Sequence, residues 1–115
     1  MPQPDLHMNN AGQENKVRLR GVLADIRQRW TPDGSPAAIA SLVISRSDLG
    51  AARATGESSQ PIPLRATGNE ARELAQYEGH MVDIEGRLRR RYYSRHGEAH
   101  WGQVEVWVDC CQPIS

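Results

Sequence analysis

The chain of 115 residues carries 14 basic and 14 acidic residues, so its formal net charge is zero. This length fits one domain with a modest core, and the balanced charge argues against a protein that is basic over its whole surface. Lys16 is the only lysine, and five of the arginines lie between residues 87 and 95. Because a guanidinium binds phosphate bidentately and stacks on bases, this local cluster is the first candidate for a binding surface.

The two cysteines, Cys110 and Cys111, are adjacent in the sequence, so a disulfide between them would be strained. The sequence has no spaced set of cysteines and histidines typical of a zinc site. It shows no N-terminal signal pattern and no apolar run of membrane-spanning length. We therefore expect a soluble, cytoplasmic protein that holds no metal or cofactor and has no membrane partner.

Residues 1–14 are polar and rich in Pro and Asn, which predicts a disordered tail before a single domain over residues 15–115. Apolar and charged residues alternate over residues 16–30, as in a β-strand, and the alternation slips at residues 24–26. Such a slip indicates a β-bulge of the kind that bends a strand around a barrel. The Pro-Asp-Gly sequence at residues 32–34 then predicts a tight turn.

A second strand is expected over residues 37–46, where apolar residues again alternate with other side chains. Residues 47–59 are rich in Gly, Ala, Ser and Thr and predict a mobile loop. A third strand follows over residues 60–66. Because Pro61 and Pro63 each remove a hydrogen-bond donor from the ladder, this strand is expected at an edge or with a bulged start.

A short helix is expected after the third strand. Thr67 and Glu70 have capping-box spacing, Asn69 is an alternative N-cap, and Gly79 is expected to end the helix. Its narrow apolar stripe consists of Ala71, Leu74 and Ala75. A helix of about two turns does not organise a core by itself, so we expect it to plug one end of a barrel.

The fourth strand is predicted over residues 82–93. Val82, Ile84 and Leu88 share its inward face, and Gly86 interrupts that row where another backbone is expected to come close. The basic and aromatic residues that follow without a break predict a projecting hairpin, although a merely solvated hairpin remains an alternative.

The fifth strand is predicted over residues 99–111. Three valines at even spacing are expected to point inward: Val104, Val106 and Val108. The residues expected to point outward are Trp101, Gln103, Glu105 and Trp107. An outward Trp on a regular strand is typical of a protein interface, so Trp107 is a candidate for a dimer contact, with nucleic acid as the second possibility.

This order of three strands, a short helix and two further strands predicts an all-β fold, a five-stranded OB-fold barrel with the helix between strands 3 and 4. Periodicity alone leaves a small sandwich or an SH3-like barrel open. The position of the helix favours the OB-fold.

A resemblance to bacterial single-stranded DNA-binding proteins covers roughly residues 15–114. It is carried by N-K-V-R-L-R-G-V-L-A-D-I-R-Q-R-W-T-P-D-G-S-P-A-A-I-A-S-L-V-I-S-R near the start and V-D-I-E-G-R-L-R-R-R-Y-Y-S-R-H-G later. The chain is more similar to a shorter relative, the primosomal replication protein N family. The similarity lies in the Gly-Ser-Pro segment at 34–36, in Pro63 to Gly68 followed by Asn69-Glu70, and in a chain that stops after the fifth strand without an acidic tail.

The resemblance implies a homodimer of OB barrels that binds single-stranded DNA during the restart of stalled replication. It also implies partners among restart helicases and helicase-loading primosome proteins. The sequence departs from the family in one respect. It has Ser58-Ser59-Gln60 where members can carry a stacking aromatic just before the third strand. If bases stack on this protein, other rings must serve, and the candidates are Trp30, Tyr92, Tyr93 and Trp101.

The candidate DNA-binding residues are the arginines and exposed aromatics of the first strand, the end of the second strand and the hairpin. They are Arg18, Arg20, Arg27, Arg29, Trp30, Arg46, Arg87, Arg89, Arg90, Arg91, Tyr92, Tyr93, Arg95 and Trp101. Trp30 and the first-strand arginines are expected to converge on the arginine-rich half of the hairpin. Trp30 has an equally weighted alternative as a residue that packs at the turn.

The sequence contains no nucleophile motif and no phosphate-binding Walker loop, so we expect a protein that is not an enzyme. The expected function is non-catalytic binding of single-stranded DNA, with RNA as the other option, through arginines and stacking rings. One alternative is an OB-fold adaptor that docks onto replication proteins with weak DNA contact. Another is a general single-stranded DNA-binding protein that lacks the acidic tail.

Overall fold

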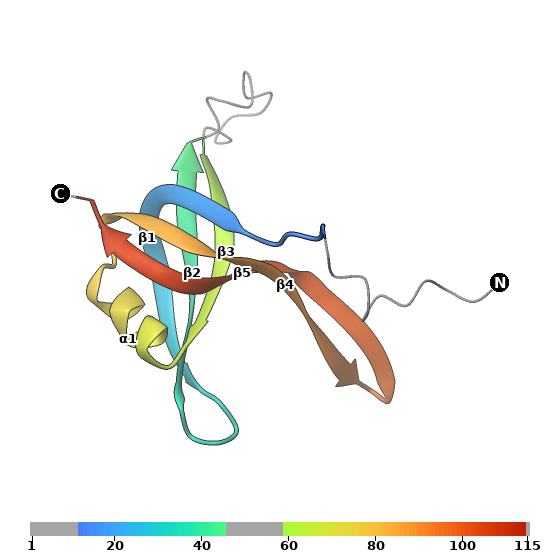
Figure 1. Cartoon of the computed structure of the whole chain (residues 1–115). Coiled ribbons are helices and arrows are strands. Elements are labelled where there is room, and N and C mark those ends of the chain that lie inside the picture. The colour runs from blue at the N-terminus through green and yellow to red at the C-terminus, as the bar shows by residue number, and fades with distance from the viewer. Residues whose placement is uncertain (1–11, 46–58, 115) are drawn as a thin grey trace.

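The computed structural model of the chain describes residues 12–45 and 59–114 (Figure 1). The elements in chain order are β1 (Val17–Trp30), β2 (Pro36–Ser45), β3 (Ser59–Thr67), α1 (Asn69–Gln76), β4 (Met81–Arg95) and β5 (Glu98–Pro113). The predicted order is therefore confirmed, with β4 and β5 longer than expected. Residues 1–11 of the predicted tail, residues 47–58 of the predicted loop and Arg46 lie outside the described residues, and Ser59 already belongs to β3.

The five strands form a closed barrel in the order β1-β2-β3-β5-β4. β1 pairs antiparallel with both β2 and β4, and β3 pairs in parallel with β5 through Leu64 and Val106. α1 packs against this barrel with Ala71 and Leu74 in the core (Figure 1). This is the OB-fold arrangement, and the sandwich and SH3-like alternatives are excluded.

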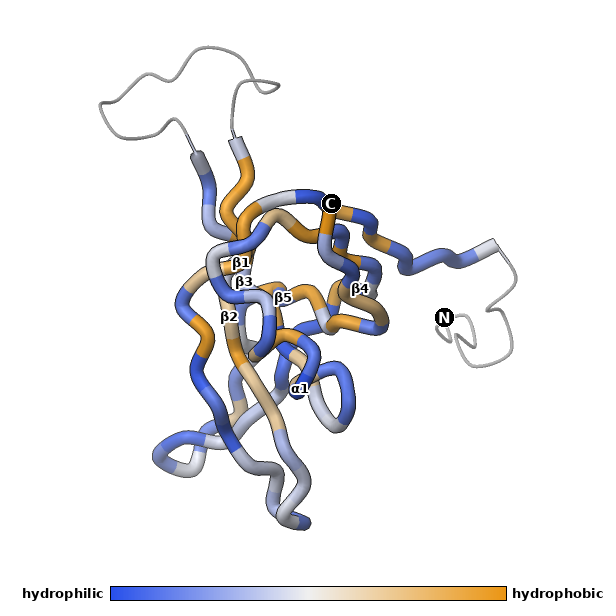
Figure 2. Tube along the Cα trace, turned by 90° about the vertical axis from the view of Figure 1, so that its left-hand side faces the viewer, coloured by the Kyte–Doolittle hydropathy of each residue, from blue (hydrophilic) through white to orange (hydrophobic). Residues whose placement is uncertain are grey.

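The core of this chain, which contains no Phe, is aliphatic, and hydrophobic and hydrophilic residues alternate along the strands that enclose it (Figure 2). Its largest fully buried side chains are Leu23, Leu42, Leu64, Leu74, Ile84, Val82 and Val106. Gly86 lies in the inward row of β4, at a position that has no room for a side chain. A Cβ at this position would lie 2.2 Å from the Trp107 carbonyl oxygen, so the predicted close backbone approach is confirmed.

The predicted bulge in β1 is present. The register with β2 shifts between Ala24 and Arg27, and Asp25 adopts a left-handed backbone with φ of 54°. Aspartate tolerates this conformation better than most residues. The extra residue shifts the alternation of β1, so that side chains after the bulge point to the opposite face from the one that regular alternation would give them.

Both predicted N-caps of the helix are wrong. The N-cap is Gly68, and no side chain caps the helix. Thr67 is still paired with Ala37 in the β2–β3 ladder, and the chain turns into α1 through Gly68, whose φ is 64°. The helix also ends earlier than Gly79, because the Tyr77 amide bonds to the Leu74 carbonyl in a tight final turn.

Two residues expected inside the barrel are exposed. Leu88 and Val104 lie on the same sheet face as buried Val106, yet their side chains are 48% and 49% exposed. The barrel wall ends where β3 meets Val106, and β4 and β5 continue past it as a two-stranded hairpin (Figure 1). Alternation fixed the face of each residue but not the point at which the barrel stops covering that face.

On the β1 side of β4, Asn15 marks the point at which the barrel ends and the hairpin begins. Its side-chain amide donates to the Leu88 carbonyl and accepts from the Leu88 amide, both at 2.8 Å. The side chain thus adds one more pair of hydrogen bonds beyond the last β1–β4 backbone pair, Val17 with Gly86.

Among the described residues, no helix is long and apolar enough to cross a membrane.

Candidate nucleic-acid interface

A groove crosses the outer face of the barrel, with residues from all five strands and a volume of about 480 Å³. We call it the strand groove. Its floor is formed by apolar and small residues of β2 and β3, and its charged lining residues are Asp25, Arg27, Arg65, Arg91 and Glu105. In OB-folds the β2–β3 face, flanked by the β1–β2 and β4–β5 loops, is the surface that binds oligonucleotides.

The β1 bulge supplies one wall of the strand groove. Because β1 carries an extra residue between Ala24 and Arg27, Asp25 and Arg27 both line the groove. Among the described residues, the Arg27 side chain has no hydrogen-bond or ion-pair partner, and its position in the strand is exposed. Arg27 is therefore an available cation at the groove.

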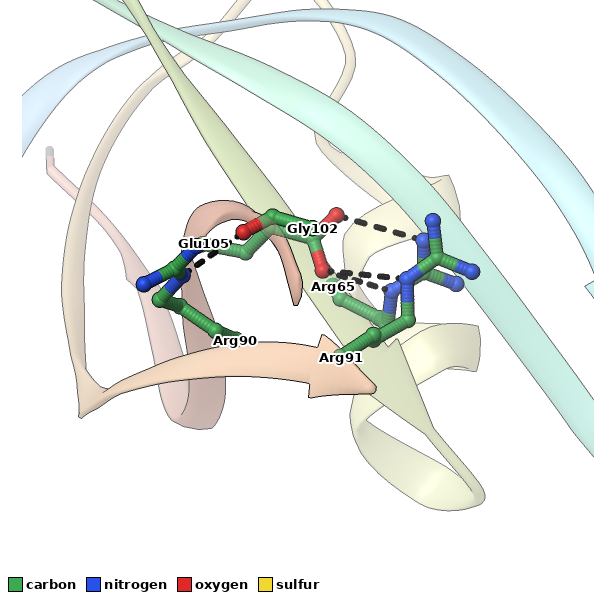
Figure 3. A network of polar contacts seen from close by, with 5 residues as sticks. All are labelled: Arg65, Arg90, Arg91, Gly102 and Glu105. Atoms are coloured by element: carbon green, nitrogen blue, oxygen red, sulfur yellow. Dashed lines mark hydrogen bonds and ion pairs between the residues drawn. The ribbon is translucent and has the colours of Figure 1, made fainter. Parts of the chain in front are cut away.

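The opposite wall is built on a buried carboxylate, Glu105, which is 5% exposed. Arg65 donates two hydrogen bonds to it, from Nε to Oε1 and from Nη2 to Oε2, each of 3.2 Å. The Arg91 Nε lies 3.6 Å from the same Oε1. Figure 3 shows the two guanidinium groups meeting this one carboxylate from β3 and β4.

Beyond the groove, the hairpin carries an aromatic pair. The rings of Tyr92 and Trp101 lie opposite each other on β4 and β5, with centroids 4.8 Å apart and planes inclined by 57°. They are 63% and 59% exposed. Arg90 places its guanidinium 5.5 Å from the Trp101 ring and donates a 2.7 Å hydrogen bond to the Gly102 carbonyl (Figure 3).

A bulge in the hairpin makes this arrangement possible. Two residues of β5, Gly102 and Gln103, stand opposite the single residue Arg91 between the pairs on either side. A Cβ on Gly102 would come within 3.7 Å of the Tyr93 ring and 3.4 Å of the Arg91 carbonyl. Tyr93 itself packs on His100, with ring centroids 5.9 Å apart. One tyrosine thus packs within the hairpin and the other joins the exposed pair.

Three arginines of β4, Arg87, Arg89 and Arg91, form a row on its outer face, and each of them contacts a residue of β5. Arg87 pairs with Asp109 at 3.1 Å, and the guanidinium carbon of Arg89 lies 4.2 Å from the Trp107 ring centroid. The row ends with Arg91 on Glu105. These arginines are exposed but already partnered, so binding a phosphate requires each to share or exchange its contact.

Trp107, the candidate dimer contact, is half-buried, and Arg89 covers its ring. Its indole Nε1 is buried without a hydrogen-bond partner among the described residues.

Arg18 and Arg20 lie on the barrel wall and not in the strand groove. Arg20 makes a bidentate pair with Asp83, at 2.8 and 3.1 Å, and Arg18 lies 3.9 Å from Glu85. The hydrogen bond between Arg20 and Asp83 raises the pKa of the guanidinium and lowers the pKa of the carboxyl. The outward acidic residues of β4, Asp83 and Glu85, therefore form ion pairs with the two first-strand arginines.

Trp30 is 71% exposed and lies beside α1, where it lines a separate small pocket with Arg29, Ala71 and Arg72. The turn that follows is closed by the Thr31 and Asp33 side chains, and the hydrogen bond from Thr31 lowers the pKa of Asp33. Trp30 and the first-strand arginines were expected to converge on the hairpin arginines. In the structure, Arg27 lines the strand groove together with Arg91, whereas Trp30 lies outside this groove. Arg95 lies at the hairpin tip opposite Glu98.

Sequence reasoning missed two residues of the groove, Arg65 and Glu105. Glu105 was expected merely to point outward, and Arg65 carried no assignment. They are 40 positions apart, on strands whose parallel pairing closes the barrel, so no local pattern links them. Within residues 12–45 and 59–114, no group of three or more His, Cys, Asp or Glu side chains is placed to hold a metal ion.

Comparisons with known proteins leave the family open: no protein-family model matches the chain, and no curated protein matches it in sequence.

Proposed function

We propose that the protein binds single-stranded nucleic acid along a path that runs from the strand groove to the Tyr92–Trp101 pair. The observation that carries this proposal is the combination of a groove holding Arg27, Arg65 and Arg91 with an exposed aromatic pair on the adjoining hairpin. Captured phosphates and stacked bases are the two requirements for binding single strands without sequence preference.

In this mechanism, Arg27 and Arg91 take the sugar-phosphate backbone at the groove, and Arg90 and Arg95 extend the basic path along the hairpin. Bases stack on the exposed face of the Trp101 and Tyr92 pair. The net charge of zero keeps long-range attraction weak, so affinity depends on local contacts.

Titration of a fluorescent oligothymidine at two salt concentrations tests the proposal. We expect binding at low salt that weakens as salt rises, because each captured phosphate releases counterions. Duplex DNA of the same length should bind less tightly, since its bases are not available for stacking. An absence of binding to the single strand at low salt would refute the proposal. The same titration with an RNA strand establishes the sugar preference.

We also propose, on the resemblance to the primosomal replication protein N family, that the protein acts as a homodimer in the restart of replication, with a restart helicase and a helicase loader as partners. Sedimentation of the wild type and of Trp107→Ala tests the dimer. A concentration-independent monomer mass for the wild type would overturn that part.

A second candidate function is that of an OB-fold adaptor docking onto replication proteins. It is favoured by the exposed apolar side chains of Leu88 and Val104 at the base of the hairpin. Pull-down from cell extract after nuclease treatment separates the two functions. Partners that are retained without nucleic acid support the adaptor, and partners lost with the nuclease support the nucleic-acid binder.

A further inference from the structure

The Glu105 cluster joins one carboxylate to two arginines of very different exposure. The Glu105 and Arg65 side chains are 7% and 17% exposed, whereas the Arg91 side chain is 54% exposed. Arg65 makes two hydrogen bonds to the carboxylate, and Arg91 makes one longer ion-pair contact. The two arginines are therefore held with unequal strength.

Arg65 cannot leave this cluster without leaving a buried charge on each side, which is costly. Arg91 can leave it, because Glu105 remains satisfied by the two hydrogen bonds from Arg65 and because the Arg91 guanidinium is already half in solvent. The Arg91 side of this contact is open to solvent and the contact is a single long one, so exchanging the carboxylate for another anion costs Arg91 little.

We propose that Glu105 is the positioning residue of the strand groove: it holds Arg65 fixed and holds Arg91 only until a phosphate arrives, at which point Arg91 exchanges the carboxylate for a phosphate oxygen. This inference rests on the proposed function. In the free protein the groove has three arginines and two carboxylates, a local excess of one positive charge. Glu105 therefore competes with phosphate for Arg91 and sets how tightly the groove binds a nucleic-acid backbone.

The test is a double-mutant cycle between Glu105→Gln and Arg91→Ala, read as the affinity for oligothymidine and its salt dependence. Glutamine keeps an oxygen that accepts from Arg65 but removes the charge that holds Arg91. We expect E105Q to bind about two- to fivefold more tightly than wild type, which corresponds to one weak ion-pair contact of a solvent-exposed arginine. We expect R91A to bind more weakly, with a salt slope lower by about 0.7, the loss of one phosphate contact on a single strand.

In the R91A background, E105Q should tighten binding less than it does in the wild type, because the arginine that it frees is absent and only the change in local charge remains. The matched control is Glu85→Gln, which makes the same change of net charge beside Arg18 on the barrel wall, outside the groove. E85Q should bind as the wild type does. If E105Q and E85Q tighten binding equally, or if E105Q acts equally with and without Arg91, the exchange does not occur and the inference is wrong.

A measurement on the wild-type protein covers the case in which E105Q does not fold. Arginine Nε–Hε signals in ¹⁵N NMR spectra, assigned with R91A, report each guanidinium during titration with oligothymidine. We expect the Arg91 signal to shift and the Arg65 signal to stay. A shift of Arg65, or none of Arg91, overturns the inference while the proposed binding stands. Failure of the wild type to bind at all overturns the proposed function first.

Discussion

Removal of the Trp101 ring separates stacking from charge at the proposed interface. Trp101→Ala deletes one exposed ring of the Tyr92–Trp101 pair and leaves every arginine in place. Stacking of one base on an aromatic side chain is worth about 1–3 kcal/mol. This free energy corresponds to a loss of affinity of about five- to 150-fold.

The effect on folding should be small by comparison. The ring is 59% exposed, and a cross-strand aromatic pair contributes about 0.2–1 kcal/mol. Fluorescence anisotropy with labelled oligothymidine, measured at four or more salt concentrations, is the assay. The dissociation constant should rise while the salt slope stays at the wild-type value, because no phosphate contact is removed.

Two further variants make this result specific. Trp101→Phe keeps a ring and should retain most of the affinity. Trp30→Ala deletes an indole that is more exposed than Trp101 and lies beside α1, outside the strand groove, and this variant should bind as the wild type does. Equal losses in W101A and W30A, or an unchanged dissociation constant in W101A, would refute the stacking argument. A fall in the salt slope of W101A would show that the ring acts by placing Arg90.

Three predictions concern the fold. Gly86→Ala should destabilise the protein by about 1–3 kcal/mol in chemical denaturation, because its Cβ would lie 2.2 Å from a β5 carbonyl oxygen; wild-type stability would contradict the close approach. Burial raises the pKa of Cys111 to about 11, so at pH 8 a thiol reagent should modify Cys110 first and Cys111 only after unfolding; two equally fast thiols would disprove this. The hydrogen bond from Arg20 lowers the pKa of Asp83 below 3.8, so its stabilisation is complete above that pH and is lost as the pH falls through the folded-state pKa. Melting temperatures of Asp83→Asn should therefore fall less steeply than those of the wild type below pH 4, and parallel curves would refute the pairing.

The barrel could be predicted from the sequence because its elements are encoded locally. Alternation predicted the strands, the phase slip near Asp25 predicted the bulge, and the helix position distinguished the OB-fold. Local sequence rules gave wrong predictions for the helix N-cap and for the burial of two strand residues, because the tertiary structure determines both. Thr67 has the spacing of an N-cap, but its place in the β2–β3 ladder prevents that role. Leu88 and Val104 alternate correctly, but Leu88 lies beyond the last β1–β4 backbone pair and Val104 lies beyond the β3–β5 pairs.

The candidate site was predictable only in part for the same reason. The density of arginines identified the hairpin, and cross-strand pairing of Tyr92 with Trp101 follows from a hairpin register. The partners of the arginines could not be derived, because each contact joins strands whose relative register is set by closure of the barrel. Arg65 and Glu105 meet through the parallel β3–β5 pair, and Arg20 meets Asp83 through the β1–β4 pair.

The hydrogen bonds of Asn15 also mark where the open strand edge of the hairpin begins, at which another copy of the protein could pair. After the Asn15–Leu88 hydrogen bonds on one side and the β3–β5 pairs on the other, the hairpin strands of the described chain pair only with each other. Open strand edges are templates for edge-to-edge aggregation, and charged side chains and bulges are the usual protection against it. The consecutive residues Arg89, Arg90 and Arg91 and the bulge beside them fall on this open stretch. We therefore expect these three guanidinium groups, two of which (Arg90 and Arg91) we assign to the nucleic-acid path, also to disfavour the addition of further strands to the hairpin.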